Sequence, residues 1–125
     1  MSAQTLFVID DDADLGAAVR EELEAYDFVV RSFTQAQEAL NSISKVGPAA
    51  VIVDRWLPEM SGDAFIAAAR AAGHRVPIVL MSGDGKLERG RFDDGVVLLP
   101  KPFDIERLLS AVRTAIATVD GRASE

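Results

Sequence analysis

The chain has 125 residues, a formal net charge of −7, 49% hydrophobic residues and 26% charged residues, which is typical of one globular domain with its own core. The absence of cysteine excludes disulfides, thiolate metal sites and thiol nucleophiles, and leaves carboxylates, hydroxyls, amines and backbone groups for any chemistry. The acidic balance argues against nucleic-acid binding by this domain. With neither a signal peptide nor a membrane span visible, we expect a cytoplasmic protein without a membrane partner.

The first half of the chain alternates apolar runs with helical patterns. Residues 5–9 form a compact apolar run that predicts a strand, and an apolar stripe of helical spacing follows over residues 13–26. The members of this stripe are Leu15, Ala18, Val19, Leu23 and Tyr26. Residues 28–33 are β-branched and aromatic and predict a second strand. Thr34 and Gln37 have the spacing of a capping box, which predicts a helix from there to about residue 44.

The second half continues the same alternation. Three further strands are predicted over residues 49–53, 78–81 and 96–99. An alanine-rich helix lies between the first two of them and ends at Gly73. A last helix is expected to begin after an N-cap at Asp104 and to end at Gly121, with residues 120–125 frayed.

The five predicted strands alternate with helices, and the first, third and fourth of them are apolar almost throughout. Strands of that kind are covered on both faces, which predicts an α/β fold with a doubly wound parallel sheet. We expect a single domain over residues 1–125, with a core from about residue 5 to residue 119. The segment between Ser82 and Val96 has four glycines, and each interior glycine costs a helix about 1 kcal/mol relative to alanine. We therefore predict a short or irregular fourth helix, or an ordered loop, in that segment.

Polar side chains stand at the ends of the predicted strands. Asp10, Asp11 and Asp12 follow the first strand, Asp54 ends the third, Ser82 ends the fourth, and Lys101 follows the fifth. These ends share one edge of a parallel sheet, where ligands bind at the point at which strand order reverses. With the order 2-1-3-4-5, Asp10 or Asp11 would face Asp54 at that point. Taken singly, each of these residues is better explained as a turn former, a cap or a solvated side chain, and Asp12 in particular is suited to cap a helix.

Carboxylates that converge in a crevice repel each other, and a divalent cation removes that conflict. Mg²⁺ takes one or two carboxylates, keeps several waters and completes its shell with phosphate oxygens. Lys101 offers a positive charge to a phosphoryl group and Ser82 offers a hydroxyl, while Asp54 is the carboxylate placed to accept that group. The residues together predict a site for Mg²⁺ and a phosphoryl group.

Four stretches of the chain resemble the receiver domains of two-component response regulators, the CheY-like superfamily. They are residues 7–12 (FVIDDD), 54–62 (DRWLPEMSG), 82–83 (SG) and 101–103 (KPF). The D-x-x-x-P-x-x-x-G spacing is specific in combination with the upstream acids and the downstream K-P-F, although each piece alone is weak. The resemblance covers about residues 5–119 and implies a flavodoxin-like sheet in a signalling protein. It implies no enzyme beyond self-phosphorylation and autodephosphorylation.

The resemblance implies roles at the matching positions. Asp54 would accept a phosphoryl group from a sensor histidine kinase or a phosphotransfer protein. Asp10 and Asp11 would hold Mg²⁺ together with Asp54 and the backbone carbonyl of Trp56. A homodimer is compatible with the family, and the kinase, the pathway and the output stay open.

Two further roles, and two departures from the family pattern, concern the transmission of the signal. Ser82 would be the switch hydroxyl and Lys101 the lysine that contacts the phosphoryl group, with a cis peptide bond to Pro102. Leu98 occupies the position at which the family usually has a switch aromatic, and the stretch from Ser82 to Lys101 is shorter than expected by about one helical turn. Signal output would then use a non-standard switch.

Three alternatives remain open from the sequence. A degenerate receiver would act as a phosphorylation-independent protein-interaction module, but the retained acids, hydroxyl and lysine argue against it. A phosphatase of the haloacid-dehalogenase type also places acids after its first strand, but needs a larger core and a cap. A flavin or nucleotide binder of flavodoxin type would need a phosphate loop after the first strand, where acids stand instead.

Overall fold

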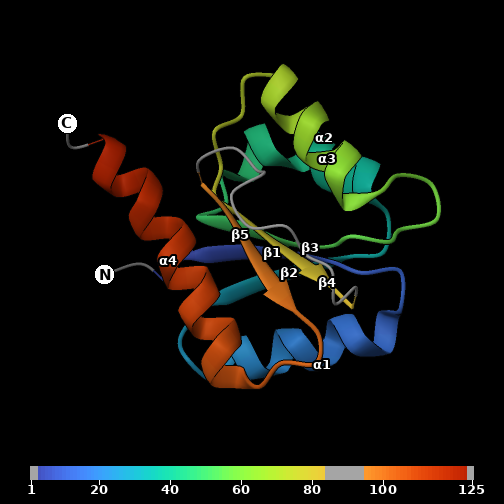
Figure 1. Ribbon diagram of the computed structural model, residues 1–125, viewed down its shortest axis with the longest axis vertical. Helices are drawn as coiled ribbons and strands as arrows, with labels where there is room; N and C mark the ends of the chain where they lie inside the picture. The colour runs from blue at the N-terminus through green and yellow to red at the C-terminus, as the bar shows by residue number, and fades with distance from the viewer. Residues whose placement is uncertain (1–2, 84–94, 124–125) are drawn as a thin grey trace.

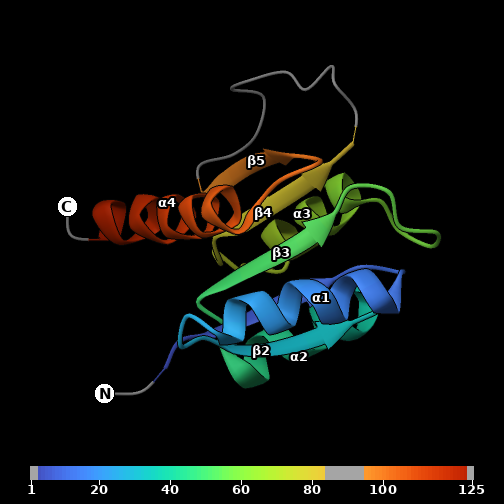
Figure 2. The same ribbon diagram turned by 90° about the horizontal axis from the view of Figure 1, so that it is seen from below.

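The computed structural model describes residues 3–83 and 95–123, and the side chains only as far as residue 117. Its strands are β1 (Thr5–Ile9), β2 (Val29–Phe33), β3 (Ala50–Asp54), β4 (Ile78–Ser82) and β5 (Val96–Pro100). They form one parallel sheet in the order β2-β1-β3-β4-β5, as predicted. The visible arrowheads in Figure 2 point to the same side, so the carboxyl ends of the strands share one edge of the sheet.

Helices cover both faces of this sheet (Figure 1). The described helices are α1 (Ala13–Glu24), α2 (Ala36–Val46), α3 (Gly62–Ala71) and α4 (Ile105–Ala123). Helices α1 and α4 pack on one face, and α2 and α3 on the other. The predicted doubly wound α/β fold is therefore confirmed. None of the helices in the described part of the chain has the length and apolar character needed to cross a membrane.

The two hydrophobic layers follow from the alternation of side chains along the strands. Along β1, Leu6 and Val8 face the α1 and α4 layer, whereas Phe7 and Ile9 face the α2 and α3 layer. Every residue of β3 and β4 is buried, which explains why these strands are apolar without a break until Asp54 and Ser82. A polar residue at the end of such a strand is held rigidly, because the whole strand before it is packed on both sides.

The predicted apolar stripe of α1 was only partly right. Leu23 is buried and Val19 half-buried, but Leu15 is 50% exposed and Tyr26 is 46% exposed. The face that α1 turns to the sheet carries Gly16, Val19 and Leu23, whose spacing of three and four residues places them in one row. Leu15 lies one residue away from that row, and Tyr26 lies beyond the last helical residue, Glu24.

Two predicted helix boundaries were also wrong. No capping box joins Thr34 and Gln37, because Gln35 is the N-cap of α2 and Gln37 Nε2 donates instead to Asn41 Oδ1 at 3.1 Å. Gly121 does not end the last helix, which continues to Ala123. The N-cap at Asp104 is confirmed, since its Oδ1 accepts from the N–H of Arg107 at 2.9 Å. The predicted short fourth helix or loop falls mostly on residues 84–94, outside the described residues.

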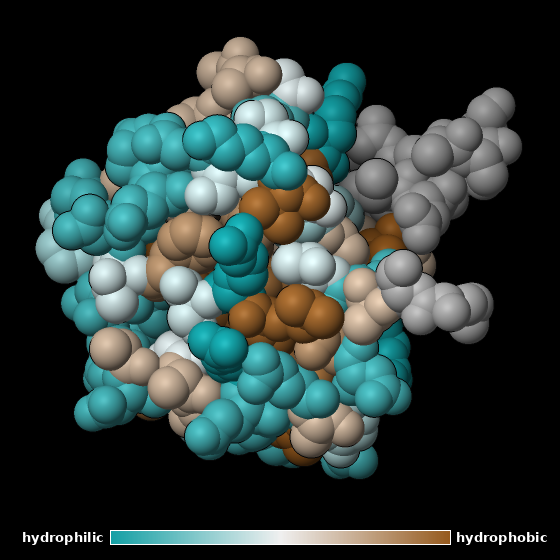
Figure 3. All heavy atoms as spheres, turned by 180° about the vertical axis from the view of Figure 1, so that it is seen from behind, coloured by the Kyte–Doolittle hydropathy of each residue, from teal (hydrophilic) through white to brown (hydrophobic). Residues whose placement is uncertain are grey.

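Charged residues make up 26% of the chain, and its formal net charge is −7. Figure 3 shows the face opposite to that of Figure 1, where hydrophilic side chains surround a hydrophobic area near the centre. Large apolar side chains that are exposed among the described residues include Val29 on the edge strand β2 and Trp56 in the loop after β3. Of these, Trp56 adjoins the carboxyl edge of the sheet on which the predicted site residues lie.

Candidate functional site

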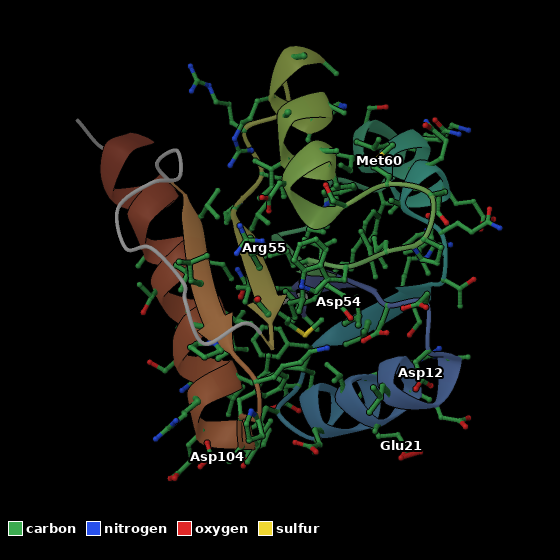
Figure 4. All side chains as sticks on the ribbon, turned by 45° about the vertical axis from the view of Figure 1, so that its right-hand side comes forward. Asp12, Glu21, Asp54, Arg55, Met60 and Asp104 are labelled. Atoms are coloured by element: carbon green, nitrogen blue, oxygen red, sulfur yellow. The ribbon has the colours of Figure 1, made fainter. Side chains whose placement is uncertain are left out.

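Three carboxylates meet at the carboxyl edge of the sheet, between β1 and β3. Asp10, Asp11 and Asp54 each offer an oxygen atom, and these atoms all lie within 4.8 Å of one another. Ile9 pairs with Val53 across the two strands, so the residues that follow on each strand are brought side by side. Asp10 is 4% exposed and Asp54 7% exposed, whereas Asp11 is exposed. Figure 4 shows Asp54 at this edge, with Asp12 at the start of α1 beyond it.

Backbone N–H groups orient two of the three carboxylates. Asp10 Oδ1 accepts from the N–H of Asp12 at 2.9 Å, and Asp54 Oδ1 accepts from the N–H of Trp56 at 3.2 Å. Asp12 itself is not part of the cluster, because its Oδ1 accepts from the N–H groups of Asp14 and Leu15 and caps α1. Of the three consecutive acids, the structure therefore assigns two to the cluster and one to the helix.

A lysine joins the cluster from the end of β5. Lys101 Nζ lies 3.0 Å from Asp54 Oδ2, and the backbone N–H of Lys101 donates to the carbonyl of Ser82 at 2.7 Å. The cis peptide bond between Lys101 and Pro102 is present as predicted. Ser82 is fully buried at the end of β4, where it pairs with Pro100. The polar residues that the sequence places at the ends of β1, β3, β4 and β5 thus lie together at one edge of the sheet.

The cluster is electrostatically costly as it stands. Burial is the main cause that raises the pKa of Asp10, and the negative charges of Asp54 and Asp11 raise it further. The hydrogen bond from Asp12 and the charge of Lys101 act in the opposite direction and only partly offset these effects. Hard carboxylate oxygens that repel each other are the ligand set that a divalent cation such as Mg²⁺ neutralises, so the residues present fit that ion.

The β3–α3 loop, residues 55–61, leaves the site directly after Asp54. At its far end the N–H of Gly62 donates to the carbonyl of Arg55 at 2.7 Å, and Arg55 Nη2 lies 3.1 Å from Asp63 Oδ2. A Cβ added at Gly62 would lie 2.5 Å from Leu80 Cδ1 and 2.9 Å from two backbone atoms, Arg55 Cα and the carbonyl oxygen of Asp54, so only glycine allows this close return of the loop. Trp56 is 62% exposed, and the centre of its ring lies 5.7 Å from the Arg55 guanidinium carbon.

Two features of the site were not found from the sequence. A groove of about 490 Å³ runs from Asp10 and Lys101 along α1, and Leu15 and Phe103 are among its lining residues. Leu15 belongs to the apolar stripe predicted for this helix, and only the structure shows that it lies outside the buried row. The second feature is a hydrogen bond from the N–H of Ala36 to Glu59 Oε1, at 3.2 Å. No sequence signal links these two residues.

A parallel sheet of order 2-1-3-4-5 with buried acids and a lysine at its carboxyl edge defines a CheY-like receiver domain. The chain belongs to the response regulator receiver domain family, whose model matches residues 6–113. The resemblance inferred from the sequence is therefore confirmed.

Individual relatives agree with this assignment. The chain is 35% identical over 117 residues to the C4-dicarboxylate transport transcriptional regulatory protein DctD of Rhizobium meliloti, covering 91% of this chain and 25% of the relative. It is 33% identical over 125 residues to the response regulator MprA of Mycolicibacterium vanbaalenii, covering 96% of this chain and 54% of the relative. The chain thus spans from a quarter to about half of the length of these curated relatives.

Solved structures agree with the fold. A CheY-like receiver domain from Methylobacillus flagellatus is 28% identical, with a TM-score of 0.78 over 91% of this chain and 99% of that chain. A receiver domain from Clostridium thermocellum is 22% identical, with a TM-score of 0.81 over 91% of this chain and 94% of that chain.

Proposed function

We propose that this chain is a phosphoacceptor receiver domain that takes a phosphoryl group on Asp54. The observation that carries the proposal is the position of Asp54, whose Oδ2 lies 3.0 Å from Lys101 Nζ and whose carboxylate also contributes an oxygen to the cluster with Asp10 and Asp11. An acceptor carboxylate needs a positive charge that attracts the incoming phosphoryl group, and it needs the negative charge of the neighbouring carboxylates to be neutralised. Lys101 supplies the first, and a divalent cation supplies the second.

The reaction is a phosphoryl transfer from a phosphohistidine of a sensor kinase or phosphotransfer protein. A carboxylate oxygen of Asp54 forms a bond to phosphorus as the bond from phosphorus to the histidine nitrogen breaks, and the imidazole leaves with the electron pair. The chain contributes mainly position and charge. The N–H of Trp56 donates to Asp54 Oδ1, and we take Oδ2, beside Lys101, as the oxygen that receives the phosphoryl group.

The acids would hold the metal ion. Asp10, Asp11, Asp54 and the backbone carbonyl of Trp56 are the proposed ligands of Mg²⁺, which when bound neutralises the carboxylates and the phosphoryl oxygens. Ser82 is the proposed hydroxyl donor to the phosphoryl group, since it is buried at the adjacent strand end. Lys101 is proposed to exchange its contact with Asp54 for one with the phosphoryl oxygens.

The signalling role follows from the family, and the output is proposed to be non-standard. Leu98 on β5 is half-buried against the layer formed with α2 and α3, and it has neither a ring nor a hydroxyl with which to follow a movement of Ser82. We propose a single receiver domain over residues 1–125, located in the cytoplasm. The proposed partner is a histidine kinase or a phosphotransfer protein, and the domain is compatible with a homodimer. We propose that the domain neither binds nucleic acid directly nor contacts a membrane.

The decisive experiment is incubation with acetyl phosphate or carbamoyl phosphate and Mg²⁺, followed by intact mass measurement. One phosphoryl adduct on the wild type that is absent from Asp54→Asn would support the proposal. If the wild type acquires no adduct while it remains folded, the chain is a receiver that acts as an interaction module without phosphorylation.

A further inference from the structure

The N-terminus of α2 is capped by a residue from a distant loop. Gln35 occupies the N-cap position but makes no side-chain hydrogen bond there. The N–H of the first helical residue, Ala36, donates instead to Glu59 Oε1 at 3.2 Å, across 23 residues of sequence. A carboxylate is well suited to this position, because the first N–H groups of a helix lack partners within the helix and form its positive end.

Glu59 belongs to the same loop that carries the acceptor site. The β3–α3 loop begins next to Asp54, and the N–H of Trp56 holds the acceptor carboxylate. Leu57 is buried and Met60 is half-buried in the layer that also contains Ala36 and other residues of α2. Figure 4 shows Met60 on the α2 side of the loop. Glu59 therefore adds a polar attachment to α2 between two apolar ones.

The other end of the loop is attached to a different element. The bonds of Arg55 to Gly62 and Asp63 close the loop against α3 and do not involve α2. The half of the loop that faces α2 depends on Leu57, Met60 and the bond from Glu59. Loss of the Glu59 carboxylate would loosen this half without removing the apolar anchors, so the fold should persist.

We infer that Glu59 is a positioning residue for the acceptor site. Its bond to α2 holds the β3–α3 loop in the conformation that presents Asp54 and the Trp56 peptide to the metal ion. This inference rests on the proposed function. When only a fraction of the molecules has the loop in the competent conformation, the apparent Kd rises by the inverse of that fraction, so the loss of this bond weakens metal binding at residues that Glu59 does not touch.

The test is a Mg²⁺ titration followed by tryptophan fluorescence, because Trp56 is the single tryptophan of the chain and stands two residues from Asp54. Glu59→Ala should raise the Kd for Mg²⁺ by about threefold to tenfold, whereas Glu59→Gln, which keeps an acceptor oxygen, should stay within about twofold of the wild type. Glu106→Ala removes an exposed acid from the first turn of α4 and is the matched control, with an unchanged Kd.

A second measurement needs no metal. Hydrogen exchange of peptides covering residues 34–37 and 55–60 should be faster in Glu59→Ala than in the wild type, with Glu59→Gln in between or unchanged. An equal rise in Kd for Glu59→Ala and Glu59→Gln would reveal a charge effect and overturn the inference. So would a lower Tm with unchanged Kd and unchanged exchange in the loop. If the wild type gives no fluorescence response to Mg²⁺ and also acquires no phosphoryl adduct, the proposed function fails, and the exchange data still decide whether Glu59 orders the loop.

Discussion

Lys101 Nζ lies 3.0 Å from Asp54 Oδ2, although the two residues are 47 positions apart in the chain. The contact joins the end of β3 to the residue that follows β5, across the intervening strand β4. Lys101 is 31% exposed at its side chain and Asp54 11%, so the pair is accessible from solvent on the lysine side. On the proposed function, this bond would hold Asp54 in position and would be exchanged for a contact with an incoming phosphoryl group.

Replacement of Lys101 should therefore impair phosphorylation more than metal binding. We expect Lys101→Met to slow phosphorylation by acetyl phosphate on the order of 100-fold, because one preorganised positive charge is lost from the site. The Mg²⁺ affinity should be kept or increased, since the cluster becomes more negative. Phosphorylation rates by intact mass and Mg²⁺ titration of the same variant measure both. Equal losses in the two measurements would contradict this separation.

The raised pKa of Asp10 predicts the pH dependence of stability without metal. Because the folded-state pKa lies above the ordinary value of 3.8, the folded protein binds the proton more tightly than the unfolded chain. Ionised Asp10 therefore lowers the free energy of unfolding. This loss is absent below pH 3.8, develops as pH rises through the folded-state pKa of Asp10, and is complete above that pKa. Asp10→Asn should accordingly stabilise the metal-free protein at neutral pH by about 1 kcal/mol.

Urea unfolding of the wild type and Asp10→Asn over a pH series checks this prediction. The stabilisation of Asp10→Asn over the wild type should shrink as pH falls through the folded-state pKa of Asp10. Saturating Mg²⁺ at neutral pH should reverse the order, because the ion stabilises only the protein that keeps the full ligand set. A difference that is independent of pH would show that the ionised carboxylate is not the cause.

The three consecutive acids should differ sharply in function. Asp11→Asn removes a member of the carboxylate cluster, and we expect it to raise the Kd for Mg²⁺ by about 10-fold. Asp12→Asn keeps a good N-cap for α1, so both Mg²⁺ binding and stability should remain close to those of the wild type. The fluorescence titration distinguishes the two variants, which carry the same change of charge at adjacent positions. Similar Kd values would refute the assignment of Asp12 to the helix.

Gly62 should not tolerate a side chain. Its Cβ in Gly62→Ala would lie 2.5 Å from Leu80 Cδ1 and 2.9 Å from the carbonyl oxygen of Asp54, so we expect a loss of about 2 kcal/mol in the free energy of unfolding. Gly16→Ala is the control, because its Cβ would meet Asp10 Cβ at an ordinary 3.9 Å inside α1. That control should gain up to about 1 kcal/mol. Urea unfolding measures the free energy of unfolding of both variants. An unchanged value for Gly62→Ala would contradict the close contacts expected for its Cβ.

Much of the site could be predicted from the sequence because each residue is tied to the end of a strand. Strands buried on both faces are apolar until they leave the sheet, so the first polar residues after them, Asp10, Asp54 and Ser82, were visible as interruptions. The parallel arrangement then places these ends at one edge, whatever the packing details. The fold class follows from this local pattern, and the convergence of the acids with Lys101 follows once the strand order 2-1-3-4-5 is taken as given.

The tertiary structure alone decided how the elements are rotated and attached. Helix periodicity could not show that Gly16, rather than Leu15, faces the sheet. The two possible buried faces are shifted by only one residue, and glycine has no side chain that would add to an apolar pattern. The cap of α2 could not be read locally either. Thr34 and Gln37 satisfied the local pattern, but the partner of Ala36 is Glu59, brought there by the packing of the loop on α2. Hydrogen bonds between segments distant in sequence depend on packing, which no local pattern encodes.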